Sequence, residues 1–197
     1  MFSRPLLSLV CRPLFIKIDN TPNPAFLKFN VGKPVMGDGG GTMDFSHIRF
    51  THISPLARRI FSVEGITRVF YGSDFVSIGK TDEEQWTVLR PLLLEILTDH
   101  FSKSLPLFTE ERPPEDTQIL EDDSEAVAMI KEIIETRIRP FVQEDGGDVA
   151  FHGFDEEDGV VHIAMKGSCS GCPSSNVTLK NGIENMLKHY VAEVQSV

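Results

Sequence analysis

Cysteine is scarce in this chain of 197 residues, which contains only Cys11, Cys169 and Cys172. Three cysteines cannot build the disulfide framework of a small secreted domain, so a close pair in such a chain favours metal or redox chemistry in a reducing compartment. Long apolar stretches are also missing, because none approaches the roughly 18 to 20 residues that a membrane-spanning helix needs. A membrane span is therefore not expected.

Basic residues are too few to favour nucleic-acid binding. The chain has 19 Lys and Arg against 29 Asp and Glu, which gives a formal net charge of −10 at pH 7. A general nucleic-acid binder needs a surplus of cations to neutralise phosphates. Charged partners, if there are any, are expected to be basic or cationic.

Charge and composition divide the sequence into four parts. Residues 1–14 combine apolar, basic and serine residues without an acid, which is typical of a mitochondrial transit segment, and its cleavage would remove Cys11. Residues 15–108 mix strand and helix patterns without a repeated βαβ unit. Residues 109–123 are acidic and poor in large apolar residues, which predicts a solvated linker. Residues 124–197 form the fourth part and are expected to be a second domain. The sequence thus predicts an α+β fold of two small domains, each a short sheet packed with helices, joined by this acidic linker.

The first domain carries both strand and helix signals. Strands are expected at three places: two over residues 15–31, and one each over residues 66–71 and 75–79. Ser54 followed by Pro55 opens a short helix, and Thr81 with Glu84 forms a capping-box pattern before a longer helix. The glycine-rich segment 37–41 lacks the Gly-Lys-Ser/Thr ending of a phosphate-binding loop, so it is interpreted as a flexible connection.

The second domain is predicted to contain a helix, a hairpin and another helix. Ser124 offers a cap for the first helix, and Pro140 is expected to break or kink it because proline cannot complete the backbone hydrogen bonding. Asp145 and Asp148 are interpreted as capping and turn residues, in preference to a paired acid and base. The alternation over residues 149–166 predicts two strands around an acidic turn.

The two closely spaced cysteines, Cys169 and Cys172, have two residues between them, so both sulfurs can reach one metal centre or each other. The apolar periodicity from Leu179 to Tyr190 predicts a helix after them, so the pair is expected on a tight turn between strand and helix. Pro173 is a good first helical residue, which places Cys172 beside the positive end of the helix dipole. That position favours the thiolate, the form that binds metals and attacks disulfides.

Two thiolates leave several kinds of chemistry open. A structural zinc site takes four protein ligands, and neither His189 nor His162 lies at a spacing that completes a finger. A four-thiolate iron–sulfur cluster meets the same shortage in one chain, but a symmetric dimer removes it by bringing Cys169 and Cys172 of both copies around one cluster. Thiol–disulfide exchange is the main alternative, although the preceding elements are helix, strand, strand and not βαβ. Two structural cysteines without chemistry are a further alternative.

Short motifs around the cysteines occur in a characteristic combination: Arg139-Pro140, Glu144-Asp145-Gly146-Gly147-Asp148, Gly167-Ser168-Cys169-Ser170-Gly171-Cys172-Pro173-Ser174-Ser175, Thr178-Leu179-Lys180 and Gly182-Ile183-Glu184. Through them, residues 124–197 resemble the Nfu domain, the C-terminal module of NifU-type iron–sulfur proteins. Residues 19–108 resemble the Nfu N-terminal domain through four further motifs: Thr21-Pro22-Asn23-Pro24, Leu27-Lys28-Phe29, Ser54-Pro55-Leu56-Ala57 and Gly65-Ile66-Thr67-Arg68-Val69-Phe70.

This resemblance implies a non-enzymatic scaffold or carrier in the mitochondrial matrix. It implies that Cys169 and Cys172 bind a [4Fe-4S] cluster shared between two subunits. The cluster would pass to apo-proteins such as lipoyl synthase and respiratory enzymes, with assembly factors as further partners. A thiol–disulfide or zinc-binding protein using the same cysteine pair is the alternative function. Family members usually continue from the last helix into a third strand, so the short ending Val194–Val197 predicts a short final strand and a weak sheet edge.

Overall fold

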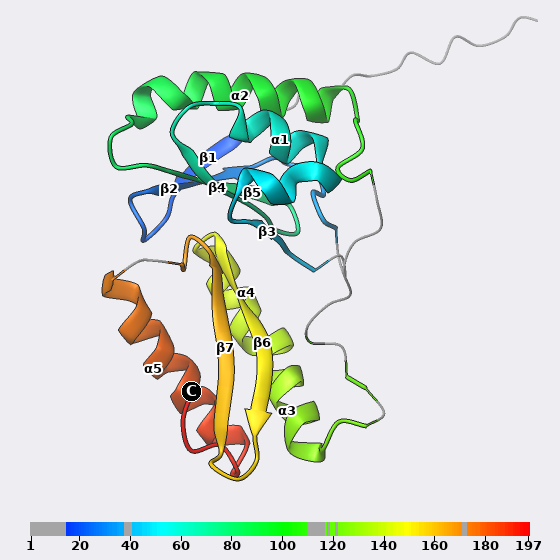
Figure 1. Cartoon of the computed structure of the whole chain (residues 1–197), viewed down its shortest axis with the longest axis vertical. Helices are drawn as coiled ribbons and strands as arrows, with labels where there is room; N and C mark the ends of the chain where they lie inside the picture. The colour runs from blue at the N-terminus through cyan, green and yellow to red at the C-terminus, as the bar shows by residue number, and fades with distance from the viewer. Residues whose placement is uncertain (1–14, 38–40, 110–116, 118, 121, 171–172) are drawn as a thin grey trace, which may run out of the picture.

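The computed structural model describes residues 15–37, 41–109, 117, 119–120, 122–170 and 173–197, with the side chains of residues 173–176 excepted. The expected transit segment therefore lies outside the described residues. Two α+β units lie one above the other in Figure 1, the first built around a five-stranded sheet and the second around a two-stranded hairpin. Within the described residues, no helix has the length and apolar character that a membrane crossing requires.

The first unit, which we call the N-terminal domain, is an antiparallel sheet covered by helices. The sheet order is β1-β2-β5-β4-β3, with these bounds: β1 Lys17–Asn20, β2 Phe26–Asn30, β3 Met43–Phe45, β4 Ile66–Tyr71 and β5 Phe75–Lys80. The helices are the 3-10 helix η1 Ile48–Ile53, α1 Pro55–Phe61 and α2 Trp86–Ser102. The expected strands and the helix after Ser54 are confirmed, whereas β3 and η1 were not predicted.

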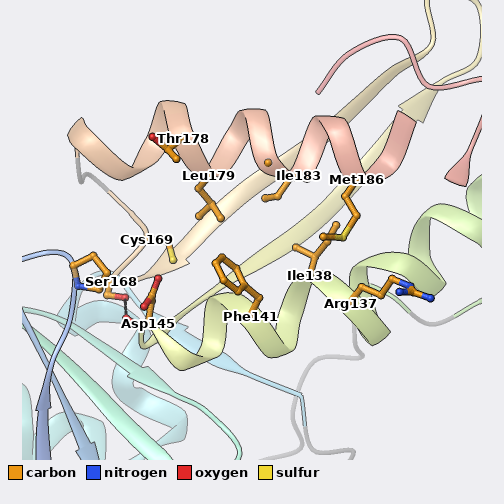
Figure 2. Close-up of a pocket in the computed structure, with 12 residues that line it drawn as sticks. Arg137, Ile138, Phe141, Asp145, Ser168, Cys169, Thr178, Leu179, Ile183 and Met186 are labelled. Atoms are coloured by element: carbon orange, nitrogen blue, oxygen red, sulfur yellow. Dashed lines mark hydrogen bonds between the residues drawn. The ribbon is translucent and has the colours of Figure 1, made fainter. Parts of the chain in front are cut away.

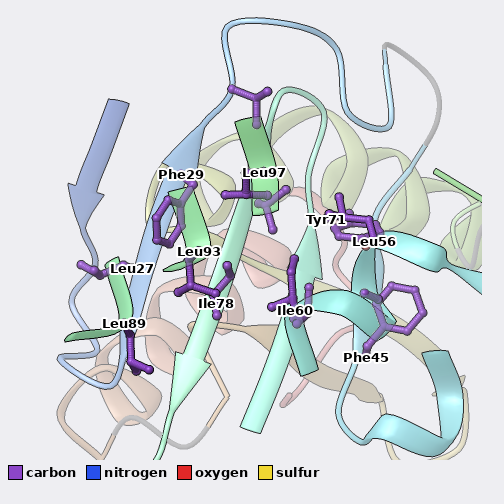
Figure 3. Close-up of a cluster of buried hydrophobic side chains, with 14 of the residues drawn as sticks. Leu27, Phe29, Phe45, Leu56, Ile60, Tyr71, Ile78, Leu89, Leu93 and Leu97 are labelled. Carbon is purple, nitrogen blue, oxygen red and sulfur yellow. The ribbon is translucent and has the colours of Figure 1, made fainter. Parts of the chain in front are cut away.

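The core of the N-terminal domain lies between the sheet and the helices (Figure 3). Leu89, Leu93 and Leu97 of α2 are buried, as the spacing of three to four residues on one face of a helix requires. Leu56 and Ile60 of α1 are buried in the same cluster. Each buried side chain of this size contributes roughly 1.5–3 kcal/mol to folding, so this cluster is the main source of the domain's stability.

The two predicted helix starts have different outcomes. Ser54 caps α1 as expected, because its hydroxyl accepts the Ala57 amide at 3.3 Å. The capping box predicted for Thr81 and Glu84 is wrong: α2 has Gln85 as its N-cap residue, with no side-chain capping bond. The Thr81 amide instead donates to the Gly65 carbonyl at 2.8 Å. Thr81 follows β5 directly, so the sheet holds its backbone and the helix begins later.

The second unit, the C-terminal domain, places a long hairpin against helices on the two sides seen in Figure 1. Its elements are α3 Glu125–Ile133, the π-helix η2 Ile134–Ile138, α4 Arg139–Glu144, β6 Gly147–Asp155, β7 Val160–Gly167 and α5 Pro173–Tyr190. Apolar side chains of the helices and of the hairpin form one buried cluster. The predicted order of helix, strand, strand and helix is therefore confirmed.

The expected break at Pro140 takes the form of a wider helical turn. The segment η2 ends one residue before α4, and the Arg139 amide bonds to the Ile134 carbonyl five residues earlier. Proline has no amide hydrogen and crowds the preceding turn, so a local π-turn accommodates it without ending the helical path. Arg139 is thereby directed into the interior, where it is buried.

The ends of the C-terminal domain are tied to its body. The final segment forms a single parallel bridge, Ser196 to Val160, in place of a full third strand, which agrees with the short ending expected.

In the acidic segment 109–123, the expected solvation fails at two described residues. Thr117 is buried and donates to Glu135 at 2.8 Å, and Asp123 pairs with buried Lys131 at 2.6 Å. Both contacts join this segment to the C-terminal domain, because Glu135 belongs to η2 and Lys131 to α3.

Replacing Ser54 with alanine should lower the free energy of unfolding of the N-terminal domain by about 2 kcal/mol. Its hydroxyl serves the first turn of α1 and also bonds the buried Tyr71 hydroxyl at 3.0 Å, so both groups would lose a partner. Urea denaturation followed by the fluorescence of Trp86, the single tryptophan, measures the change.

The matched control for this variant is Ser62→Ala. The Ser62 hydroxyl is exposed and donates only to the Arg59 carbonyl at 2.6 Å, so a change below about 0.5 kcal/mol is expected. Similar losses for Ser54→Ala and Ser62→Ala would contradict the buried role of Ser54.

Candidate functional site

The cysteine loop follows β7 and precedes α5, as the sequence predicts. The strand ends at Gly167, Cys169 comes two residues later, and α5 begins at Pro173. The Cys169 side chain is 5% exposed and belongs to the apolar core of the C-terminal domain. Cys172 lies outside the described residues, so the structure leaves its place in the loop as a prediction.

The position of the Cys169 sulfur is fixed by close packing against the backbone of the hairpin. A Cβ atom on Gly147, the first residue of β6, would lie 2.3 Å from this sulfur and 2.8 Å from the Lys166 carbonyl oxygen. Any larger residue would therefore displace the thiol. Gly167, at the end of β7, has a φ of +59°, a conformation that other residues adopt only with strain. The two glycines allow the paired strands to end directly beneath the cysteine.

An apolar groove opens beside Cys169, between η2 and α4 on one side and α5 on the other. Its volume is about 530 Å³, and it is lined mainly by apolar side chains: Ile138, Phe141, Leu179, Ile183 and Met186. Figure 2 shows the Cys169 sulfur and the Phe141 ring directed toward the same space. Phe141 is 60% exposed. The cysteine loop therefore borders an accessible and mainly apolar surface.

The backbone before and after Cys169 is held by several hydrogen bonds. The Ser168 hydroxyl donates to the Asp145 carbonyl at 2.5 Å, and the Ser170 amide donates to the Gly167 carbonyl at 3.1 Å. The Asn23 side chain of the N-terminal domain donates to the Ser168 carbonyl at 3.2 Å. The loop thus receives support from both domains.

Asp148 is a buried charge and not the turn residue that the sequence suggested. It lies within β6 with no exposed surface, and its carboxylate is 3.3 Å from the Arg139 guanidinium. The same carboxylate accepts the Val149 amide at 2.8 Å and the Thr42 hydroxyl of the N-terminal domain. Burial raises the pKa of Asp148, and the positive charge of Arg139 opposes that rise. The arrangement stabilises the junction of the two domains.

The two histidines that the sequence analysis considered and set aside as metal ligands, His189 and His162, lie far from the cysteine loop along their own elements. His189 is in the last turn of α5, 16 residues beyond Pro173, which corresponds to about 24 Å along a helix. His162 is an exposed residue of β7, five residues before Gly167, or about 17 Å along a strand. Among the described residues, no group of three or more His, Cys, Asp or Glu side chains is arranged to hold a metal ion.

Sequence reasoning missed the contribution of the N-terminal domain to this site. Asn23 was named only within the family motif Thr21-Pro22-Asn23-Pro24, and Thr42 was not singled out. Asn23 and Ser168 are separated by 145 positions in the sequence, so no local pattern connects them. The flanking Pro22 and Pro24 do indicate a rigid turn, which is the one signal that marks this segment as a possible contact site.

Two family models match the chain, and together they cover both domains. The model described as "NifU-like domain" matches residues 130–197. The model described as "Scaffold protein Nfu/NifU N terminal" matches residues 16–104. The first match contains the cysteine loop and the groove beside it, and the second contains the five-stranded sheet.

Curated relatives match almost the whole chain. "NifU-like protein 5, mitochondrial" of Arabidopsis thaliana is 54% identical over 188 residues, which cover 94% of this chain and 68% of the relative. "NFU1 iron-sulfur cluster scaffold homolog, mitochondrial" of Drosophila willistoni is 50% identical over 197 residues, covering 99% of this chain and 67% of the relative. The chain thus spans about two thirds of the length of these relatives.

Replacing Asp148 with alanine should lower the free energy of unfolding by about 3 kcal/mol, because it removes a buried partner of the Arg139 charge. Urea denaturation followed by circular dichroism measures this loss. Lys188→Ala is the control, since the exposed Lys188 pairs with Glu184 at 2.6 Å and such surface pairs contribute about 0–1 kcal/mol. A loss for Asp148→Ala no larger than that of the control would refute the structural role of the buried pair.

Proposed function

This chain belongs to the family of NifU-like iron–sulfur cluster scaffold proteins, and we propose that it is a mitochondrial carrier that holds a [4Fe-4S] cluster between two copies of itself. In this proposal Cys169 and Cys172 of each copy bind the cluster. The cluster is cargo, since the carrier gives it up to apo-proteins of the mitochondrial matrix. Lipoyl synthase and respiratory enzymes are the proposed kinds of recipient.

The observation that carries the proposal is the position of Cys169. It sits on a short loop between a strand and the start of a long helix, packed against backbone and next to an accessible groove. One copy of the Cys-x-x-Cys motif supplies two thiolates, whereas a [4Fe-4S] cluster takes four. A second copy related by a two-fold axis supplies the remaining two from the same loop.

Release of the cargo follows from ligand exchange. A thiol of the recipient gives up its proton and forms a bond to iron as the bond from iron to Cys169 or Cys172 breaks, and that proton passes to the departing sulfur. No electrons are gained or lost, so the step needs no oxidant or reductant. Because each copy contributes only two of the four ligands, the carrier gives up the cluster more readily than a site with four ligands in one chain.

The carrier role is tested by anaerobic reconstitution of the full chain with iron and sulfide. The proposal predicts the visible absorption of an iron–sulfur cluster, about four iron ions per two chains, and a shift from monomer to dimer in size-exclusion chromatography. Reversible disulfide formation without iron uptake would favour the thiol–disulfide alternative. Uptake of one zinc ion per chain, with iron excluded, would favour a zinc-binding protein.

Cysteine substitutions test the ligand assignment. Cys169→Ser and Cys172→Ser should each remove the cluster and the cluster-dependent dimer. A dimer of two variant chains offers only two of the four thiolates that the cluster takes. Cys11→Ser is the matched control and should retain both properties. Iron content and elution volume are the measurements, and a cluster-loaded dimer of Cys172→Ser would contradict the shared-ligand arrangement.

A further inference from the structure

The turn Thr21–Pro24 of the N-terminal domain lies against the cysteine loop of the C-terminal domain. The Asn23 side chain, 8% exposed, donates to the Ser168 carbonyl at 3.2 Å and approaches the Ser170 carbonyl at 3.5 Å. These two carbonyls flank Cys169 on either side. We propose that Asn23 is a positioning residue that fixes the backbone around Cys169 and so controls how accessible this thiol is.

The orientation of the Asn23 amide is fixed by its neighbours. Its side-chain oxygen accepts the backbone amide of Ala25 at 3.0 Å, so its nitrogen faces the two loop carbonyls. A carbonyl needs a donor and a backbone amide needs an acceptor, and only this orientation of the side chain satisfies both. Asn23 therefore donates to the loop through a group that cannot rotate without losing a second hydrogen bond.

The turn that carries Asn23 is itself anchored in the N-terminal domain. The Thr21 hydroxyl donates to the Asn23 carbonyl at 2.7 Å and is 3.2 Å from the Phe26 carbonyl. The Trp86 indole of α2 donates to the Pro24 carbonyl at 3.1 Å. Since both anchors belong to the N-terminal domain, Asn23 transmits the position of that whole domain to the cysteine loop.

Two further contacts hold the domains together around the loop. Lys28 of β2 donates to the Gln143 and Glu144 carbonyls at 2.9 and 3.2 Å, where α4 ends. Thr42 bonds the buried Asp148 of β6. With Asn23, these contacts connect the N-terminal domain to α4, β6 and the loop. Three separate attachments restrict rotation of one domain on the other, so the loop has few alternative conformations.

The consequence concerns Cys169, which is only 5% exposed and packs in the apolar cluster of the C-terminal domain. When the donor at Asn23 is removed, the peptide groups on both sides of Cys169 lose their fixed partner. The loop then samples conformations in which the thiol is open to solvent. Where a cluster is bound, and this part rests on the proposed function, the same freedom speeds its loss.

The test uses the full chain in its reduced, metal-free state. Asn23→Asp keeps the acceptor for Ala25 and removes the donor to the loop, whereas Asn23→Ala removes both. The rate of Cys169 alkylation by iodoacetamide, measured by peptide mass spectrometry at a pH where thiols are ionised, should rise about fivefold to tenfold in both variants. The added negative charge of Asn23→Asp disfavours the ionised form of a nearby thiol, so a faster reaction cannot come from that charge.

The matched control is Asn30→Ala. Asn30 lies in the same domain and donates to Asp19 at 2.8 Å, away from the cysteine loop, so its alkylation rate should equal that of the unchanged protein. Wild-type rates in both Asn23 variants, with an unchanged circular dichroism spectrum, would overturn the proposal. If the Asn23 variants fail to fold, Thr42→Val provides the second test, because it loosens the same domain contact and should also speed alkylation.

A second measurement separates this inference from the carrier function. Reconstituted Asn23→Asp should start with the same iron content as the unchanged protein and lose its cluster to a chelator about fivefold faster. If the unchanged protein takes up no cluster, the carrier proposal fails while the alkylation result still decides the role of Asn23. Equal alkylation rates together with normal cluster uptake would leave the carrier function standing and remove the role of Asn23.

Discussion

The buried pair of Arg139 and Asp148 is the constraint on which the rest of the structure depends. A charge without water costs several kcal/mol unless a partner and hydrogen bonds surround it. Here the Arg139 guanidinium comes from the start of α4 and the Asp148 carboxylate from β6. Thr42 of the N-terminal domain adds one hydrogen bond to that carboxylate. Glu135 and Thr117 also bond the Arg139 guanidinium, but the Asp148 carboxylate has all the partners described above only when helix, hairpin and first domain are in place. The pair therefore couples the folding of the C-terminal domain to the position of the N-terminal domain.

The cysteine loop gains its geometry from the same junction. The π-turn η2 directs Arg139 inward, β6 begins at Gly147 beneath the Cys169 sulfur, and Asp148 follows at the next position. One short stretch thus carries the glycine that makes room for the thiol and the acid that fixes the strand. A shift of β6 by one residue would displace both, because neighbouring side chains point to opposite faces of a strand. Packing and site geometry are for this reason inseparable here.

The elements that local patterns define could be predicted from the sequence. The hairpin of the second domain, the helix after Ser54 and the strand–loop–helix setting of the cysteines depend on alternation, capping and proline signals within a few residues. The capping box at Thr81 failed because the adjacent sheet holds that backbone. β3 was missed because three residues are too short to show alternation.

The contacts between domains could not be predicted for a different physical reason. They join residues that are more than a hundred positions apart, and each uses a polar group that also has an ordinary local explanation. Asp148 fits a turn motif, and Asn23 fits a turn between prolines. Only the packed structure shows that both groups are buried and which distant groups satisfy them. The family resemblance directed attention to the two cysteines, but it contained nothing about the contacts that the first domain makes with the backbone beside Cys169.

The limited exposure of Cys169 also bears on chemical damage. Oxidation by peroxide proceeds through the thiolate and requires the oxidant to touch the sulfur. With Gly147 on one side and the core of the C-terminal domain on another, small oxidants reach this sulfur chiefly along the groove bordered by Phe141. The Cys169 sulfur is thereby shielded against sulfenic acid formation by peroxide, because only 5% of this residue is exposed.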